Sequence, residues 1–328
     1  MQRIALALLL SALPGYHAQL YFTASSTLIP DSSSQVWTMP TNGDVDAMEL
    51  VVDIPKPNED LGAFTGAVAC GDVYYGIWAV VLQAVGVFGV NITTGSLIFK
   101  EETELHFQVL ECAPGGFIGA ATSVAGDGAI YMASYDAATK NTNVISKFPS
   151  NLIFGSFDNA FVFSEDGTEL WSALPQEKGN PVLTIMSTST GEITDQREFP
   201  SARDGSPYVV FPGTVPGVTQ GSAFVQNINN EKILRWSNFT IPAGVTTDIS
   251  ISSGADVSAY MYSSSQPLAL CGGDTAYSFF ESDTLVDDFF DVPVIGGISA
   301  FNKATGVLLW KTSLPQLKNK KWGALACV

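Results

Sequence analysis

A pattern of two short strands joined by a polar turn occurs twice in this chain. Residues 86–99 and 297–310 each show an alternating apolar stretch, an Asn-x-x-Thr-Gly turn, and a second stretch that ends in an aromatic residue. Asparagine starts such turns by bonding to its own backbone, and glycine takes the position that needs a positive φ. The two segments therefore predict two β-hairpins of the same design.

Weaker copies of this hairpin lie before and between the two strong ones, at residues 36–52, 135–140, 183–193 and 223–236. A second repeated feature, an apolar strand followed by a turn, occurs at residues 66–72, 109–112, 268–274 and 324–327. Together these features predict a unit of four strands. Such a unit, at a period of roughly 40–50 residues, is typical of a β-propeller blade.

We therefore predict an all-β chain that forms a single β-propeller of four-stranded blades. The blade count follows from the repeated turn positions Thr41, Thr94, Thr139, Thr190, Asn230 and Thr305. The interval between Asn230 and Thr305 is too long for one blade, so it holds either an inserted loop or a degenerate blade within residues 243–266. Six blades with an insertion is the preferred interpretation, and seven is the alternative.

The two ends of the chain supply complementary parts of one unit. Residues 19–23, 35–39 and 47–53 provide strands of the second to fourth kind, whereas residues 322–328 provide a lone first strand. The C-terminal strand is therefore predicted to join the N-terminal blade and close the ring. Closure of this kind hides the sheet edges that would otherwise pair with other chains.

The first residues predict secretion. Arg3 precedes an apolar run at residues 4–13, and Pro14 and Gly15 then end the run. This order is typical of a secretory signal peptide, and the run is too short to span a bilayer. We expect a signal peptide at residues 1–18, a propeller domain at residues 19–328, and no membrane span.

Two Asn-x-Thr sequons are candidate glycosylation sites in a secreted protein. They begin at Asn91 and Asn238. Asn91 lies in the turn of a predicted hairpin. Asn238 lies in a strand-like run beside Trp236 and Phe239, which makes it the weaker acceptor.

The charge balance excludes several classes of function. The chain has 15 Lys and Arg against 32 Asp and Glu, a formal net charge of −17, and two His. Nucleic-acid binding is not expected, because phosphate contacts need clustered basic side chains. After removal of the signal peptide only His106 remains, so neither a multi-His zinc site nor a His-dependent catalytic residue is assigned.

The most acidic segment is residues 281–291. Its carboxylates could hold calcium, and its interleaved Phe residues could dock a partner. The preferred interpretation is a solvated acidic loop, so no metal ligand is assigned.

Four cysteines occupy one position of the repeat: Cys70, Cys112, Cys271 and Cys327. An even number in a secreted chain suggests two disulfides. Neighbouring sheets pack about 10 Å apart, whereas bridged Cα atoms lie within about 7 Å, so the cysteines could meet only near the central axis. The alternative is that they are small apolar residues of the inner strands.

The hairpins at residues 86–99 and 297–310 resemble the repeat of quinoprotein-type (PQQ-like) β-propellers. That family contains PQQ-dependent dehydrogenases and many non-enzymatic scaffolds. Several of the enzymes carry two adjacent cysteines beneath the cofactor, and this sequence has no such pair. The resemblance therefore implies a scaffold, with a Trp that wedges between blades and with neither PQQ nor calcium expected as a cofactor.

The function that follows is a secreted, monomeric scaffold that binds an extracellular protein or glycan through its loops. The alternative is an extracellular enzyme, either a carboxylate-based hydrolase or lyase or a quinoprotein-like oxidoreductase. A third interpretation is a structural component of a surface or matrix with no discrete ligand.

Overall fold

The structure is a computed structural model of the 328-residue chain. The residues that it describes are 18–25, 34–54, 62–80, 84–124, 129–149, 161–164, 166–174, 182–198, 207–212, 220–228, 233–240, 250–251, 255–256, 269–270, 274–281, 295–317 and 322–328. Residues 1–17, and with them most of the expected signal peptide, lie outside these ranges. Within the ranges, no helix is both long and apolar enough to cross a bilayer.

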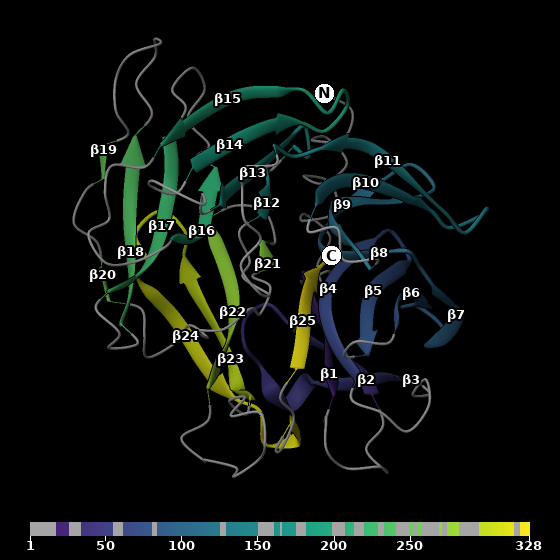
Figure 1. The fold of residues 1–328 in the computed structure, drawn as a ribbon. Helices are drawn as coiled ribbons and strands as arrows, with labels where there is room; N and C mark the ends of the chain where they lie inside the picture. Colours follow the sequence, from purple (N-terminus) through teal and green to yellow (C-terminus); the bar gives the residue numbers. More distant parts are fainter. Residues whose placement is uncertain are drawn as a thin grey trace.

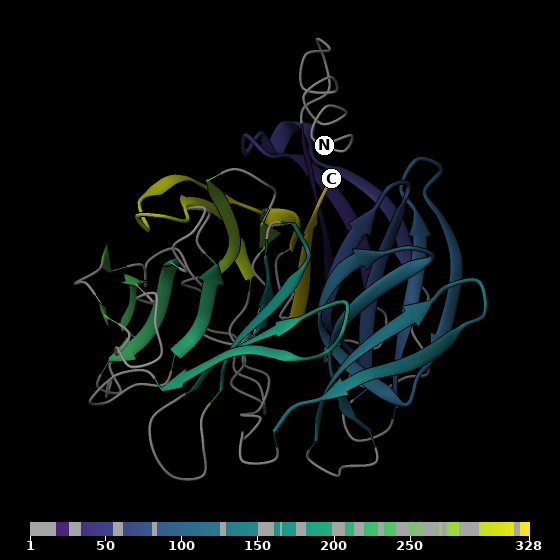
Figure 2. The ribbon, with the colours of Figure 1, turned by 90° about the horizontal axis from the view of Figure 1, so that it is seen from above.

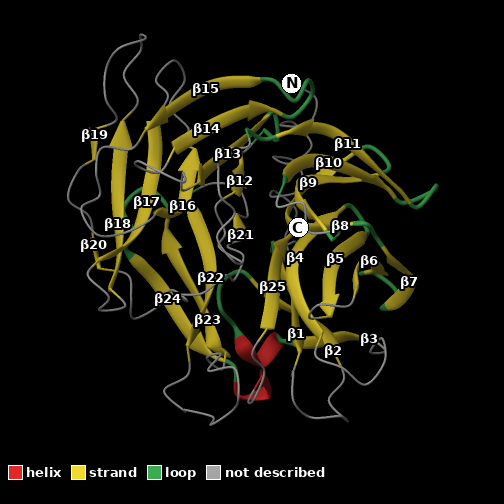
Figure 3. Cartoon of the chain, in the orientation of Figure 1, coloured by secondary structure: helices red, strands yellow, loops and turns green. Residues whose placement is uncertain are grey.

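Strands form nearly all of the regular structure, and consecutive strands pair antiparallel into sheets (Figure 3). The first sheet contains β1 (Gln19–Ser25), β2 (Ser34–Pro40) and β3 (Glu49–Ile54), joined by β25 (Trp322–Cys327). The second contains β4 (Gly62–Cys70), β5 (Val73–Val80), β6 (Ala84–Asn91) and β7 (Ser96–Glu102). The third contains β8 (Leu105–Ala113), β9 (Gly116–Ser123), β10 (Ile130–Asp136) and β11 (Asn141–Lys147).

The second half of the chain continues the pattern. One sheet contains β12 (Phe161–Phe163), β13 (Glu169–Leu174), β14 (Val182–Ser187) and β15 (Ile193–Glu198). The next contains β16 (Pro207–Pro212), β17 (Gln220–Ile228), β18 (Ile233–Thr240), β19 (Ser250–Ile251) and β20 (Ala255–Asp256). The last contains β21 (Ala269–Leu270), β22 (Thr275–Glu281), β23 (Ile295–Asn302) and β24 (Leu308–Ser313). Two short 3₁₀ helices are η1 (Val45–Ala47) and η2 (Pro315–Leu317).

The sheets are arranged around a common axis, as Figures 1 and 2 show. The first strands of neighbouring sheets contact one another along the ring: β25 contacts β4, β4 contacts β8, β8 contacts β12, β12 contacts β16, and β21 contacts β25. The chain is thus a single all-β propeller whose first strands lie innermost.

The predicted number of four-stranded blades, six or alternatively seven, is wrong. Five sheets have four strands, which is fewer than the six or seven four-stranded blades that we expected. In the remaining sheet the hairpin predicted at residues 223–236 forms β17 and β18, the middle strands, not the last two. Two short strands, β19 and β20, both pair with β18. A hairpin motif defines two neighbouring strands but does not reveal their place in the sheet.

Closure of the ring follows the prediction. Strand β25 pairs antiparallel with β1, in a register that places Leu20 opposite Cys327 and Phe22 opposite Leu325. The terminal backbone groups of Gln19 and Val328 also exchange two hydrogen bonds, of 3.2 and 3.1 Å. Both chain ends that the structure describes are therefore fixed within one sheet.

The repeated hairpins turn by one shared set of hydrogen bonds. In the β6–β7 turn, Oδ1 of Asn91 accepts hydrogen bonds from the backbone of Thr93 and from the backbone and hydroxyl of Thr94, at 2.8–3.1 Å. Gly95 follows with φ +66°, a conformation that glycine adopts without strain. Asn302 forms the same bonds in the β23–β24 turn. The sequence repeat is therefore a structural repeat.

Aromatic side chains pack between neighbouring sheets. Trp310 of β24 lies against Gly43 in the turn after β2, where an added Cβ atom would come within 2.9 Å of the indole. Phe99 of β7 stacks on Tyr135 of β10, with ring centroids 5.9 Å apart. Trp310 and Phe99 hold the same place in their hairpins, so the repeat positions a ring between blades.

Glycines within the blades make room for further aromatic rings. Gly86 of β6 is opposite Trp78 of β5, and an added Cβ would lie 2.4 Å from the indole. Gly297 of β23 is opposite Phe280 of β22, with an added Cβ 2.6 Å from the ring. Lys311 lies over the ring of Phe280, with its Nζ 4.0 Å from the ring centroid. The backbone carbonyl oxygens of Glu101 and Thr312 lie closer still to the Cβ added at Gly86 and Gly297, so a side chain at either glycine would displace a packed ring and the neighbouring strand.

Candidate functional site

The inner strands bring cysteines together at one end of the ring. Cys70 ends β4, Cys112 lies one residue before the end of β8, and Cys327 ends β25. These strands are neighbours around the axis. The candidate site is built on this end of the ring.

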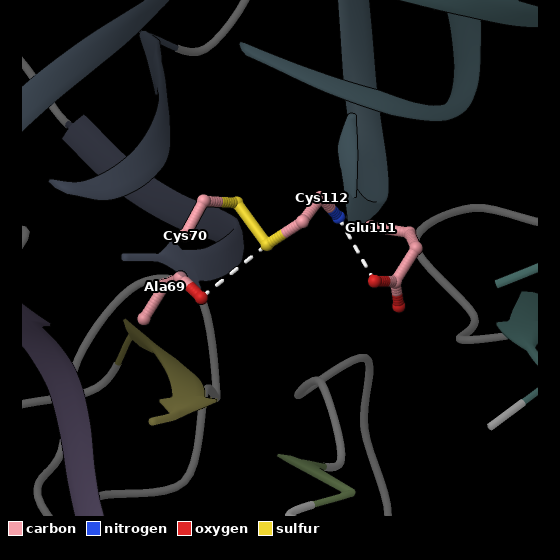
Figure 4. The surroundings of a disulfide bond; sticks show 4 residues. All are labelled: Ala69, Cys70, Glu111 and Cys112. Carbon is pink, nitrogen blue, oxygen red and sulfur yellow. Dashed lines mark hydrogen bonds between the residues drawn. A yellow bond between two sulfur atoms is a disulfide. The ribbon is translucent and has the colours of Figure 1, made fainter. Parts of the chain in front are cut away.

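A disulfide joins Cys70 and Cys112, with their Cα atoms 5.5 Å apart (Figure 4). Cys112 is exposed, so the bond reaches the surface. The bond links the innermost strands of two sheets, where the separation is far below the usual distance between packed sheets. Cys327 is also disulfide-bonded. Cys271 lies outside the described residues.

The Cys112 sulfur has a close backbone neighbour. Its Sγ lies 3.3 Å from the carbonyl oxygen of Ala69. A disulfide sulfur carries no proton, so in the oxidised state this is a contact. A reduced Cys112 thiol could donate a weak hydrogen bond to the same oxygen.

Glu111 is the carboxyl group beside the disulfide. Its Oε1 accepts a hydrogen bond of 3.0 Å from the backbone N–H of Cys112 (Figure 4). Burial raises the pKa of Glu111 above its usual value, and the hydrogen bond from Cys112 opposes this only partly. Gly167, in the turn between β12 and β13, lies so close that an added Cβ would be 3.3 Å from Cγ of Glu111. Glu111 therefore sits between the disulfide and the neighbouring sheet.

The same turn holds a carboxyl group with the opposite shift. Asp166 accepts hydrogen bonds of 2.7 Å from the hydroxyls of Ser164 and Thr168, and one of 3.0 Å from the backbone of Thr168. These bonds hold the pKa of Asp166 below its usual range. Two carboxyls whose environments move their pKa values apart are a pattern found in acid–base sites. Here Glu111 retains its proton to higher pH and can donate a hydrogen bond.

Neither Asp166 nor Glu111 was selected from the sequence. A signal was present, because Glu111 is the one charged residue in the otherwise apolar strand Val109-Leu110-Glu111-Cys112. A charged side chain inside an inner strand needs a partner or a role.

His106 lies at the opposite end of β8. Five positions separate it from Glu111, or roughly 15 Å along the strand. Burial lowers the pKa of His106 to about 4, so the imidazole is neutral at pH 7. The structure therefore does not bring this histidine to the disulfide, and its low pKa makes it a weak base.

The two glycosylation candidates lie in other strands than the cysteines. Asn91 is half-buried at the end of β6, and Asn238 lies within β18. Among the residues that the structure describes, no group of three or more His, Cys, Asp or Glu could hold a metal ion. Of the acidic segment at residues 281–291, only Glu281 is described, at the end of β22.

The similarity of this chain to known proteins is one of three-dimensional structure. No family model matches the sequence, and no curated protein matches it. TolB from Acinetobacter baumannii is similar over 98% of this chain and 70% of its own, with a TM-score of 0.57 and 11% identity. These likenesses establish the fold alone.

Two further solved structures show the same likeness. The match to a chain of a nidogen/laminin complex covers 93% of this chain and 98% of that chain, with a TM-score of 0.53 and 10% sequence identity. The match to a functionally unknown protein from Desulfotomaculum acetoxidans covers 95% of this chain and 99% of that protein, with a TM-score of 0.51 and 9% sequence identity.

Proposed function

We propose that this chain is a secreted, PQQ-like β-propeller scaffold that binds an extracellular protein or glycan. The carrying observation is the exposed Cys70–Cys112 bond between two inner strands. Disulfides persist in oxidising compartments and are rare in reducing ones. The bond and the expected signal peptide at residues 1–18 both support secretion.

On the face of the ring that carries the disulfide, two pairs of described turns are joined by backbone hydrogen bonds. In the second sheet, the backbone N–H of Ile92 donates to the carbonyl of Asp72, joining the β6–β7 and β4–β5 turns at 2.9 Å. In the last sheet, the N–H of Lys303 donates to Asp274 in the same way, at 2.8 Å. Backbone groups engaged in this way are not free for a ligand.

The opposite face is the better ligand surface. Antiparallel strands alternate in direction, so the connections after β7 and β9 emerge there. Glu104 and Val124 are adjacent on this face, because the N–H of Val124 donates to the carbonyl of Glu104 at 3.0 Å. Val124 is 46% exposed, and Glu104 is exposed as well. We assign the binding surface to this loop face, and the protein–protein complex of nidogen with laminin supports a protein ligand.

The test is surface plasmon resonance of the secreted protein against panels of extracellular proteins and glycans. A saturable ligand is expected. The double variant E104K/V124K should weaken its binding. The matched control is E192K/I193K, an exposed Glu and an exposed aliphatic residue on the turn face. The proposal fails if no ligand saturates, and the face assignment fails if only the control weakens binding.

An extracellular enzyme is the second candidate, and Glu111 is the observation in its favour. A carboxyl with a raised pKa next to a turn that holds one with a lowered pKa suits a hydrolase or lyase. Turnover of a polysaccharide or ester panel that disappears in E111Q would support this candidate. Dye reduction after reconstitution with PQQ and calcium would support the oxidoreductase version.

A further inference from the structure

We propose that Asn91 carries an N-linked glycan on the turn face of the propeller, and that Asn238 does not. The inference rests on the proposed secretion, because the modification occurs in the secretory pathway. It goes beyond the sequon itself. In the β6–β7 turn the amide oxygen of Asn91 accepts the hydrogen bonds that form the turn, and the amide nitrogen takes no part in them.

The hydrogen bonds of the turn orient the Asn91 carboxamide. Three donors, two from Thr94 and one from Thr93, converge on one atom of the amide, which must be the oxygen, because only the oxygen accepts. The amide nitrogen, Nδ2, is then on the other side and makes no hydrogen bond among the described residues. Thr93 and Thr94 are exposed, so the surroundings are open.

The chemistry of transfer is compatible with this turn. Nδ2 of Asn91 forms a bond to C1 of a lipid-linked oligosaccharide, while the bond from C1 to the lipid diphosphate breaks. The lipid diphosphate leaves, and one amide proton passes to the transferase. The product keeps the carbonyl oxygen and one N–H, so all three hydrogen bonds to Oδ1 survive the modification.

Equivalent turns in this chain supply the comparison. Asn302 accepts the same three hydrogen bonds, but Ala304 stands where Thr93 completes the sequon. Asp136 also accepts them, but its carboxylate has no nitrogen to modify. Among these three turns, the one at Asn91 combines a free amide nitrogen with the hydroxyl residue that the transferase requires.

Asn238 has a different setting. It lies inside β18, between the paired residues Ser237 and Phe239. Phe239 also pairs with Ile251 of β19, so the strand has neighbours on both sides. Turns, not strands within a sheet, offer the exposed backbone expected of an acceptor site.

The experiment is expression of the full chain in a secreting eukaryotic cell. The glycan is read from the gel shift on peptide N-glycosidase treatment and from peptide masses. Asn91→Asp and Thr93→Ala should each lose the glycan, while Asn238→Gln should keep it. Both substitutions are expected to preserve the fold, because Asp136 stands at the position of Asn91 and Ala304 at the position of Thr93 in turns of the same geometry.

A gain-of-site variant tests the role of the turn. Ala304 is exposed, and Ala304→Thr completes a sequon at Asn302, so a second glycan is expected. If Asn91 carries a glycan and Ala304→Thr gains no second glycan, the geometry of the turn does not determine which asparagine is glycosylated. A chain found in the medium without sugar on Asn91 overturns this inference alone. A chain retained in the cytosol without sugar overturns secretion as well.

Discussion

The disulfide between Cys70 and Cys112 should be a major source of stability. The two cysteines are 42 residues apart, so the bond closes a loop that contains all of β5, β6 and β7. Closing such a loop restricts the unfolded chain. The chain-entropy relation gives about 4 kcal/mol of stabilisation for a loop of this length.

We therefore expect C70A/C112A to fold with its free energy of unfolding lowered by about 4 kcal/mol. Cys112 is exposed and its substitution removes little packing, whereas Cys70 is half-buried against a core cluster and its substitution adds to the loss. The assay is equilibrium urea unfolding followed by tryptophan fluorescence. The slope of the transition should also increase, because the unfolded chain without the bond exposes more surface.

Reductant provides the internal control. It should destabilise the wild-type protein more than C70A/C112A, since the variant retains only the disulfide of Cys327. A loss below about 1 kcal/mol would refute the reasoning, because that is no more than an average point substitution costs. So would an equal response of the two proteins to reductant.

Three further predictions concern packing and pH. Gly86→Ala should cost about 1–3 kcal/mol or more, because the added Cβ meets the backbone carbonyl oxygen of Glu101 and the Trp78 ring. Gly71→Ala meets no atom within 4 Å and should cost only about 1–2 kcal/mol of backbone strain at φ +60°. Thermal melts compare the two variants. Burial raises the pKa of Glu111, so at a pH just above the usual carboxyl pKa the native state binds more protons than the unfolded state, and it loses stability as the pH rises. Urea unfolding at pH 4 and pH 7 should show that E111Q is more stable than the wild type at pH 7. No gain at pH 7 would contradict the burial of Glu111. Burial lowers the pKa of His106 from 6.5 to about 4, so its contribution to stability is present above pH 6.5 and is lost, by up to roughly 3 kcal/mol, as the pH falls to 4. His106→Gln should flatten that part of the plot of unfolding free energy against pH. An unchanged plot would show that another group causes the loss.

Local turn chemistry made much of this fold predictable. The Asn-x-x-Thr-Gly turns at Asn91 and Asn302 form the hairpins expected of them, and the pairing of β25 with β1 follows from the complementary chain ends. These features depend on residues close in sequence, or on the repeat itself.

Features that depend on the place of a strand in the ring were harder to predict. The hairpin of β17 and β18 has the right local pattern, but pairing with β19 and β20 decides its position in the sheet. The spacing of the cysteines left the pairing of Cys70 open, because the distance between inner strands depends on how the blades converge. The raised pKa of Glu111 could not be predicted because it comes from burial, and the groups that bury a side chain, such as the turn at Gly167, can lie far away in the sequence.

The central claim, a secreted propeller whose inner strands are linked by a disulfide, is tested most directly by mass mapping of unreduced protein collected from the culture medium. We predict a chain that begins at Gln19 and a linked peptide pair containing Cys70 and Cys112. Because Cys327 is also bonded, a second pair with Cys271 is expected. A chain that retains Met1 and carries four free thiols would contradict the account.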